Sequence, residues 1–191
     1  MILEGIVTTL DSSGGVHITP MGPHVDTAIE HMVLKPFQTS QTFGNLKVHP
    51  EAVFHVSDDV LLLAQAAIGA IDPIPHMVPA LQVDGRILTD ACRAYELRVV
   101  SLDDSEARAR IEVEVLRTVR IRDFFGFNRA KHAVVEAAIL ATRIGILPLE
   151  EIQTEFRRLA VMVVKTGGEQ EHQAFKMLQD YVGAKASKEV S

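Results

Sequence analysis

The sequence has little of several things that particular classes of protein need. Of its 191 residues one is cysteine, at position 92, none is tryptophan, and aromatic residues make up 5%. A single cysteine cannot form a disulfide within the chain, which favours a reducing compartment, the cytoplasm. Scarce aromatic side chains leave few surfaces on which nucleic-acid bases could stack.

Concentrated positive charge and long apolar runs are also missing. The net charge is -6 and the lysines and arginines are scattered, whereas nucleic-acid binding needs massed positive charge. No apolar run reaches the roughly 18 residues that a membrane span needs, and the opening MILEGIVTTL is typical of a strand rather than a signal peptide. We therefore expect neither nucleic acid nor a membrane as a partner.

Motifs of metal and nucleophile chemistry are absent from the sequence. The eight histidines show no HExxH or similar ligand spacing, and no serine sits at a recognisable nucleophile elbow. We expect no metal and name no catalytic residue. If the protein does chemistry, a bound cofactor is expected to carry it.

The first two-thirds of the chain are rich in strand signals. Hydrophobic residues make up 47% of the sequence, enough for a full core in one domain or in one domain with a helical appendix. Residues 61–67 suit either a helix or a buried strand, and residues 71–80 are expected to be irregular. Short strands joined by turns favour a small antiparallel barrel or sandwich. Strands are expected at residues 2–10, 16–21, 27–35, 52–56, 95–102 and 111–115.

After Phe127 the hydrophobic period changes to that of helices. We expect a helix over 129–146 with Asn128 as its N-cap, a second helix that begins at Pro148, and a third over 169–182. Gly183 is expected to end the third helix, and the last eight residues to be frayed. The predicted fold class is α+β with a mainly β core, divided into residues 1–125 and a helical region of residues 126–191.

One segment, KPFQTSQTFGNL at residues 35–46, combines a cation with several hydroxyl groups. A phosphate ester needs convergent donors, which Lys35, Ser40, Thr42 and a helix that starts near Thr42 would supply. The alternative is that Ser40 only caps this helix and Lys35 is a solvated strand end. The residue pattern alone leaves both interpretations open.

A polar stripe follows the helix expected after Asn128. At 100° per residue, Arg129, His132, Glu136 and Arg143 fall within about 60° of one another, and most other residues of that helix are apolar. The stripe either faces solvent or faces a site or subunit interface, where the two arginines would bind anionic groups.

A turn at residues 18–23 closes the second expected strand. Gly22 and the prolines around it fix a turn whose backbone a planar ligand can approach closely, since glycine has no Cβ. A plain strand-ending turn is the alternative.

Together these segments resemble a known family. A strand ending in Thr-Pro-Met-Gly, then Lys-Pro-x-x-x-Ser-x-Thr-x-x-Asn-Leu, then a strand followed by Asp-Asp, resembles the FMN-binding split-barrel flavoproteins. The block GFNRAKHAVVEA at residues 126–137 resembles the DUF447 family, which pairs a split β-barrel with a C-terminal helical part. The resemblance covers residues 1–185, and its most specific parts are residues 35–46 and 126–143.

The resemblance implies a homodimer that holds one FMN per subunit in the cleft between the subunits. The phosphate would lie against Lys35, Ser40 and Thr42 with Asn45 nearby, and Arg129, Glu136 and Arg143 would form a wall of the flavin or substrate pocket. A lysine at position 35, where an arginine would also serve, implies a looser phosphate grip. The isoalloxazine would lie along Thr19, Pro20, Met21 and Gly22, with Asp58 as a further neighbour.

The function implied is that of an FMN-dependent oxidoreductase with an unidentified substrate, in a family associated with tetrahydromethanopterin-type C1 metabolism. Two alternatives stay open. In the first, the protein is a non-enzymatic flavin-binding carrier or sensor. In the second, it is an assembly protein in which the barrel only dimerises.

Overall fold

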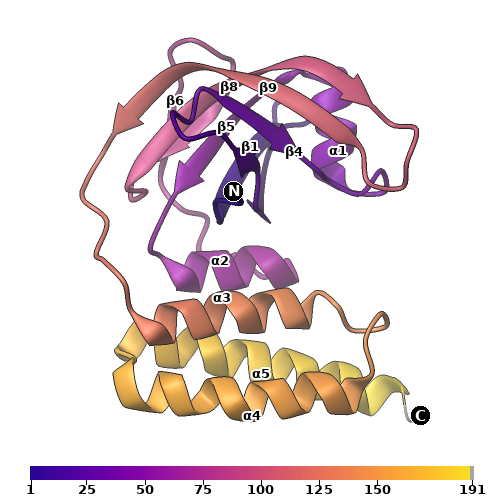
Figure 1. The fold of residues 1–191 in the computed structure, drawn as a ribbon, viewed down its shortest axis with the longest axis vertical. Helices are drawn as coiled ribbons and strands as arrows, with labels where there is room; N and C mark the ends of the chain where they lie inside the picture. The colour runs from indigo at the N-terminus through magenta and orange to yellow at the C-terminus, as the bar shows by residue number, and fades with distance from the viewer. Residues whose placement is uncertain (190–191) are drawn as a thin grey trace. The chain divides into compact units, whose positions relative to one another are not determined.

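The computed structural model describes residues 1–189, which form two compact units. The first unit comprises residues 1–57 and 74–124, and the second comprises residues 58–73 together with the chain from 125 onward. Strands dominate the first unit and helices the second (Figure 1). The domain limit expected after residue 125 stays a prediction, and these units depart from it in the segment 58–73, which groups with the C-terminal helices.

An antiparallel sheet of seven strands forms the body of the first unit in the described chain. Its strand order is β2-β1-β5-β8-β9-β4-β3, while β6 and β7 pair separately. Helix α1 (Gln41–Val48) follows β4. The strands are β1 (Gly5–Leu10), β2 (Val16–Met21), β3 (His24–Val25), β4 (His31–Leu34), β5 (Glu51–Val56), β6 (Met77–Pro79), β7 (Arg86–Leu88), β8 (Arg93–Asp103) and β9 (Arg110–Arg120).

The hairpin of β8 and β9 is the longest feature of this sheet and arches over it in Figure 1. β8 pairs with β5 and β9 pairs with β4, so the hairpin joins the two halves of the sheet. Register shifts at Glu96/Leu97 and Val99/Ser101 interrupt the ladder. Such irregularities increase the local twist and bend of a strand, which suits a sheet that curves.

The main core of the first unit is a cluster of buried side chains from the sheet and from α1. Gly5 permits the packing there, because a Cβ at this residue would lie 2.3 Å from the His55 carbonyl oxygen and 2.7 Å from the Phe54 ring. The Phe54 and Tyr95 rings pack with their centroids 6.1 Å apart. Other large buried side chains of this core are Val7, Met32, Leu34, Leu46, Leu97 and Ile111.

His55 is a buried polar side chain that joins three strands. Its side chain is fully buried, with Nδ1 3.2 Å from the Ile6 carbonyl of β1, and its Nε2 accepts from the Leu88 N–H of β7 at 3.1 Å. This pattern requires a neutral ring that carries its proton on Nδ1. Burial lowers the pKa of His55 from 6.5 to about 4, an effect that the hydrogen bond to Ile6 partly offsets.

The second unit is a bundle of α2 (Val60–Ile68), α3 (Arg129–Ala141), α4 (Leu149–Thr166) and α5 (Glu169–Glu189). α3 and α5 each contact the other three helices of the described unit. The buried face of α3 is built from five alanines and one valine, whose small side chains let neighbouring helices approach closely. Phe156 of α4 and Phe175 of α5 pack with centroids 5.5 Å apart.

A polar cluster joins three of these helices at one end. Lys131 of α3 lies 2.8 Å from the Glu171 carboxylate of α5 and donates to the Asp58 carbonyl before α2 at 2.8 Å. Gln170 donates to the Asp59 carboxylate at 3.0 Å. Burial raises the pKa of Glu171, but the hydrogen bonds from Lys131 and the Gly168 N–H, with the Lys131 charge, outweigh it and lower that pKa.

The structure confirms the strand at residues 16–21, the hairpin of β8 and β9 and the Asn128 cap, whose side chain accepts from the Lys131 N–H at 3.1 Å. The segment 61–67 is helical, and the Met77–Pro79 strand lies within residues expected to be irregular. No helix of the described residues is both long and apolar enough to cross a membrane.

Several expected boundaries were wrong, and the first strand begins at Gly5 rather than at Ile2. The helix expected to reach Ile146 ends at Ala141, and Gly145 beyond it adopts a φ of 83°, which lies outside the α-helical range. α5 continues through Gly183 to Glu189, because alanine and lysine, which favour helices, follow the glycine. Residues 190 and 191 of the expected frayed end lie outside the described residues. The strand expected over 27–35 begins only at His31, after a bend with Ile29 at a φ of 57°.

We predict that the first unit loses stability in mild acid through His55. The unfolded chain takes up a proton near pH 6.5, whereas the folded ring resists it until about pH 4, so the free energy of unfolding falls as pH drops between these values. The loss should reach about 3 kcal/mol. Urea unfolding followed by circular dichroism at pH 7, 5.5 and 4 measures it. The H55Q variant should have a weaker pH dependence over this range, and an unchanged dependence would contradict the prediction.

A second prediction concerns the polar cluster of the helical unit. E171Q should lower the free energy of unfolding by about 3 kcal/mol, because it leaves the mostly buried Lys131 ammonium without its counter-charge. E155Q is the matched control, since Glu155 pairs with Arg158 at 2.7 Å on the exposed face of α4 and should cost less than about 1 kcal/mol. Equal losses of unfolding free energy in the two variants, measured by urea unfolding, would show that the cluster contributes no more stability than an exposed ion pair.

Candidate functional site

A cavity of about 330 Å³ opens in the first unit. Its walls come from the N-terminal segment, the end of β2, the loop between β4 and α1, and the turn between β8 and β9. Among the described residues, no carboxylate lines the cavity. The lining has two cationic side chains, several hydroxyl or backbone groups and some apolar side chains. The lining residues are Ile2, Thr19, Pro20, Met21, Gly22, His24, Lys35, Pro36, Phe37, Ser40, Thr42 and Arg108.

The N-terminus of α1 borders this cavity. Ser40 is the N-cap: its hydroxyl accepts from the Phe43 N–H at 3.2 Å and donates to the Phe37 carbonyl at 2.7 Å. The N–H groups of a first helical turn have no partner within the helix. Those of Gln41 and Thr42 therefore remain as donors beside the cavity, at the positive end of the helix dipole.

Thr42 supplies the most informative polar group. It is only 2% exposed, yet it lines the cavity, and its hydroxyl has no hydrogen-bond partner among the described residues. Every fully buried side-chain oxygen of the described chain has a hydrogen-bond partner. Because the Thr42 hydroxyl has none, it is not fully buried, and its small accessible surface faces the cavity. An unpartnered donor in such a place favours a bound acceptor.

Two cations face the same cavity. Lys35 follows β4, and Arg108 lies in the turn between β8 and β9. Neither forms an ion pair with a carboxylate of the described chain. Sequence reasoning missed Arg108, which no local motif marks, because only the pairing of the strands brings it to Lys35.

The end of β2 forms another part of the wall. Thr19, Pro20, Met21 and Gly22 all line the cavity, and the Met21 side chain also packs against the core. A Cβ at Gly22 would lie 2.8 Å from the Ile2 side chain and 2.9 Å from the Glu4 carboxylate, so a larger residue here would have to displace these two side chains of the N-terminal segment.

Two of the residues expected around the cofactor lie elsewhere in the structure. Asn45 is buried and donates to the Thr9 hydroxyl at 2.9 Å, which fastens α1 to β1. Asp58 belongs to the second unit, where its carboxylate accepts from the Phe125 N–H at 2.7 Å. Neither residue lines the cavity.

The polar stripe of the helical unit is exposed. Arg129, His132, Glu136 and Arg143 all lie on the surface, and Arg143 comes after the end of α3. No ion pair joins these four within the described residues, and the His132 ring packs edge to face on Phe127 at 6.0 Å. None of the four lines the cavity of the first unit.

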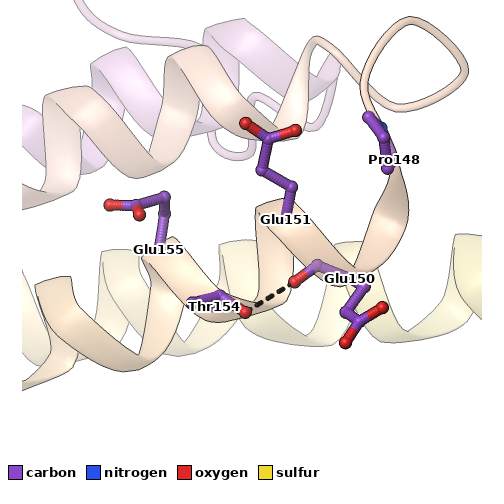
Figure 2. Close-up of a pocket in the computed structure, with 5 residues that line it drawn as sticks. All are labelled: Pro148, Glu150, Glu151, Thr154 and Glu155. Atoms are coloured by element: carbon purple, nitrogen blue, oxygen red, sulfur yellow. Dashed lines mark hydrogen bonds between the residues drawn. The ribbon is translucent and has the colours of Figure 1, made fainter.

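A second hollow, of about 340 Å³, lies along the first turns of α4. Figure 2 shows the residues that line it, Pro148, Glu150, Glu151, Thr154 and Glu155, with the Thr154 hydroxyl bonded to the Glu150 carbonyl at 2.8 Å. Three carboxylates repel an anion, so a phosphate suits the first cavity and not this one. In the described chain no three His, Cys, Asp or Glu side chains are grouped to hold a metal ion.

Comparison with known families gives two matches. The model "Protein of unknown function (DUF447) N-terminal domain" matches residues 3–122, and "Protein of unknown function (DUF447)" matches residues 128–180. A search of curated proteins finds no match.

Solved structures share the fold. The FMN-bound protein of the DUF447 family from Methanosarcina mazei is 20% identical, and the alignment covers 94% of each chain at a TM-score of 0.81. The 2-nitrobenzoate 2-nitroreductase of Pseudomonas fluorescens is 17% identical over 61% of this chain and 64% of that one, at a TM-score of 0.52. The styrene monooxygenase flavin reductase of Pseudomonas putida is 11% identical over 62% and 79%, at 0.51. The predicted fold, a split β-barrel with a C-terminal helical part, is confirmed.

Proposed function

The chain belongs to the DUF447 family, and from this premise we propose that it is a flavoprotein that binds FMN in the cavity of its first unit. The observation that carries the proposal is the cavity's donor set: an unpartnered Thr42 hydroxyl, free helix N–H groups and two cations, with no carboxylate among them. This set suits a phosphate ester. The FMN-bound relative from Methanosarcina mazei supports the same cofactor.

In this proposal the phosphate lies at the N-terminus of α1. The N–H groups of Gln41 and Thr42 and the Thr42 hydroxyl donate to its oxygens, and Lys35 supplies charge. Ser40 acts through the helix, since its hydroxyl is already bonded to Phe37 and Phe43. The isoalloxazine then lies along Thr19, Pro20, Met21 and Gly22. The backbone of these residues can form hydrogen bonds with the polar edge of the flavin ring.

The proposed activity is that of an oxidoreductase with an unidentified substrate. FMN, when bound, supplies hydride or electron transfer, and the protein binds and orients it. We further propose a homodimer with the flavin at the subunit interface, and Arg129, Glu136 and Arg143 as exposed groups available to a substrate. The cytoplasmic location and the link to tetrahydromethanopterin-type C1 metabolism stay predictions.

A carrier or sensor of flavin is the second candidate. Among the described residues, no carboxylate or thiol lines the cavity, and His24 is the one lining residue of the type that most often transfers protons in enzymes. This lining is compatible with a protein that holds flavin without turning over a substrate.

We predict that the purified protein is yellow, or takes up added FMN with a shift of the flavin absorption bands. Anaerobic addition of NADH or NADPH should then bleach the bound flavin if the protein is a pyridine-nucleotide oxidoreductase. Bound flavin that only dithionite reduces would favour a carrier or an enzyme with another donor. A colourless protein that also fails to bind added FMN would reject the proposed function.

A further prediction addresses the phosphate site. Replacement of Lys35 and Thr42 together by alanine should weaken FMN binding by about 100-fold or more, since two donors to a charged ligand are lost. Riboflavin, which lacks the phosphate, should bind nearly as before. Fluorescence titration measures both, with K176A/T154A in the second unit as a control for loss of one ammonium and one hydroxyl. Equal losses for the two ligands would show that the phosphate lies elsewhere.

A further inference from the structure

We propose that Arg108 is the second cation of the phosphate site and selects flavins that carry a phosphate monoester. The inference rests on the proposed FMN function and adds to it a residue from a distant part of the chain. Three independent features of the structure support it: the position of the turn that carries Arg108, the ring beneath the guanidinium and the lack of a carboxylate partner.

The turn that carries Arg108 is fastened to the loop that begins at Lys35. Phe37 forms an antiparallel bridge with Arg108, the Ala109 N–H donates to the Pro36 carbonyl at 3.0 Å, and the Gln38 N–H donates to the Ala107 carbonyl at 3.1 Å. The Gln38 side-chain amide donates to the carbonyls of Asp104 and Glu106 at 2.6 and 2.7 Å. Arg108 is thus held by backbone pairing beside the phosphate loop.

The Phe37 ring orients the guanidinium. The central carbon of the Arg108 guanidinium lies over that ring, 4.2 Å from its centroid, a cation–π contact. The contact with the ring uses none of the guanidinium N–H groups as hydrogen-bond donors, and within the described residues these groups have no hydrogen-bond acceptor. Phe37 also lines the cavity, so the oriented guanidinium sits at the cavity wall.

Arg108 differs from its neighbours in having no counter-charge. Arg98, Arg110 and Arg117 of the same hairpin pair with Glu51, Glu112 and Glu96 at 3.3, 2.7 and 2.7 Å. Arg108 has no carboxylate partner within the described residues, although it faces a cavity that Lys35 also lines. Two uncompensated cations at one cavity repel each other and favour an anion between them.

A phosphate monoester suits this pair. Near neutral pH it carries close to two negative charges and offers three terminal oxygens. Lys35 neutralises charge as a point, whereas the planar fork of Arg108 can donate to two oxygens at once. The expectation that the phosphate is bound weakly rested on Lys35 alone and did not include this second cation.

The test compares R108Q with R110Q. Both substitutions remove one guanidinium from the same turn region, but Arg110 pairs with Glu112 and does not line the cavity. Fluorescence titration should show FMN binding about 10- to 100-fold weaker in R108Q, with riboflavin binding within about twofold of the parent. R110Q should match the parent for both ligands. R108K, which keeps the charge and loses the fork, should fall between.

Several outcomes would overturn the proposal while leaving the FMN function intact. One is an R108Q protein that binds FMN as tightly as the parent, and another is an equal loss for FMN and riboflavin. An R108K protein as weak as R108Q would reject the role of charge. If the parent protein binds neither flavin, the proposed function itself fails. Arg108 is exposed, so thermal unfolding of the variants should match the parent and separate binding from folding.

Discussion

The pairing of the β8–β9 hairpin with both halves of the sheet is the constraint on which the rest of the first unit depends. Because β9 pairs with β4 in register, the chain that leaves β4 runs on beside the turn of the hairpin, and Phe37 bridges Arg108. The same pairing starts α1 at a fixed place, with Ser40 bonded back to Phe37. A slip of one residue in this ladder would turn each side chain to the other face and remove the cations from the cavity.

The donors at this cavity divide into those that build it and those left free for a ligand. Ser40 and Asn45 have the residue types of ligand-binding groups, but their hydrogen bonds hold α1 to the loop and to β1. The side chains of Thr42, Lys35 and Arg108 form no such hydrogen bonds within the described chain, and all three line one cavity. The Thr42 hydroxyl and the two cations are therefore the groups left available to an anion that enters the cavity.

Much of this site could be predicted from the sequence because its signals are local. Thr19–Gly22 and Lys35–Thr42 each lie on one short segment, and the strand-turn and cap patterns there depend on neighbours in the chain. Arg108 could not be predicted, since its place depends on strand register over long sequence separation. The grouping of residues 58–73 with the C-terminal helices also depends on tertiary packing: the apolar α2 fits helix or strand by pattern, and only its contacts with α3 and α5 decide.

The block that marks the family in the helical unit combines two kinds of position. Asn128 caps α3 and donates to the Thr166 carbonyl at 3.0 Å, while Lys131 joins the start of α2 to α5, so both residues are fixed by structure. Arg129, His132 and Glu136 alternate with them in sequence and point outward on α3. A helix period allows this, because residues one apart face in different directions while residues three or four apart share a face. One short motif therefore both holds the bundle together and presents charged groups on its surface.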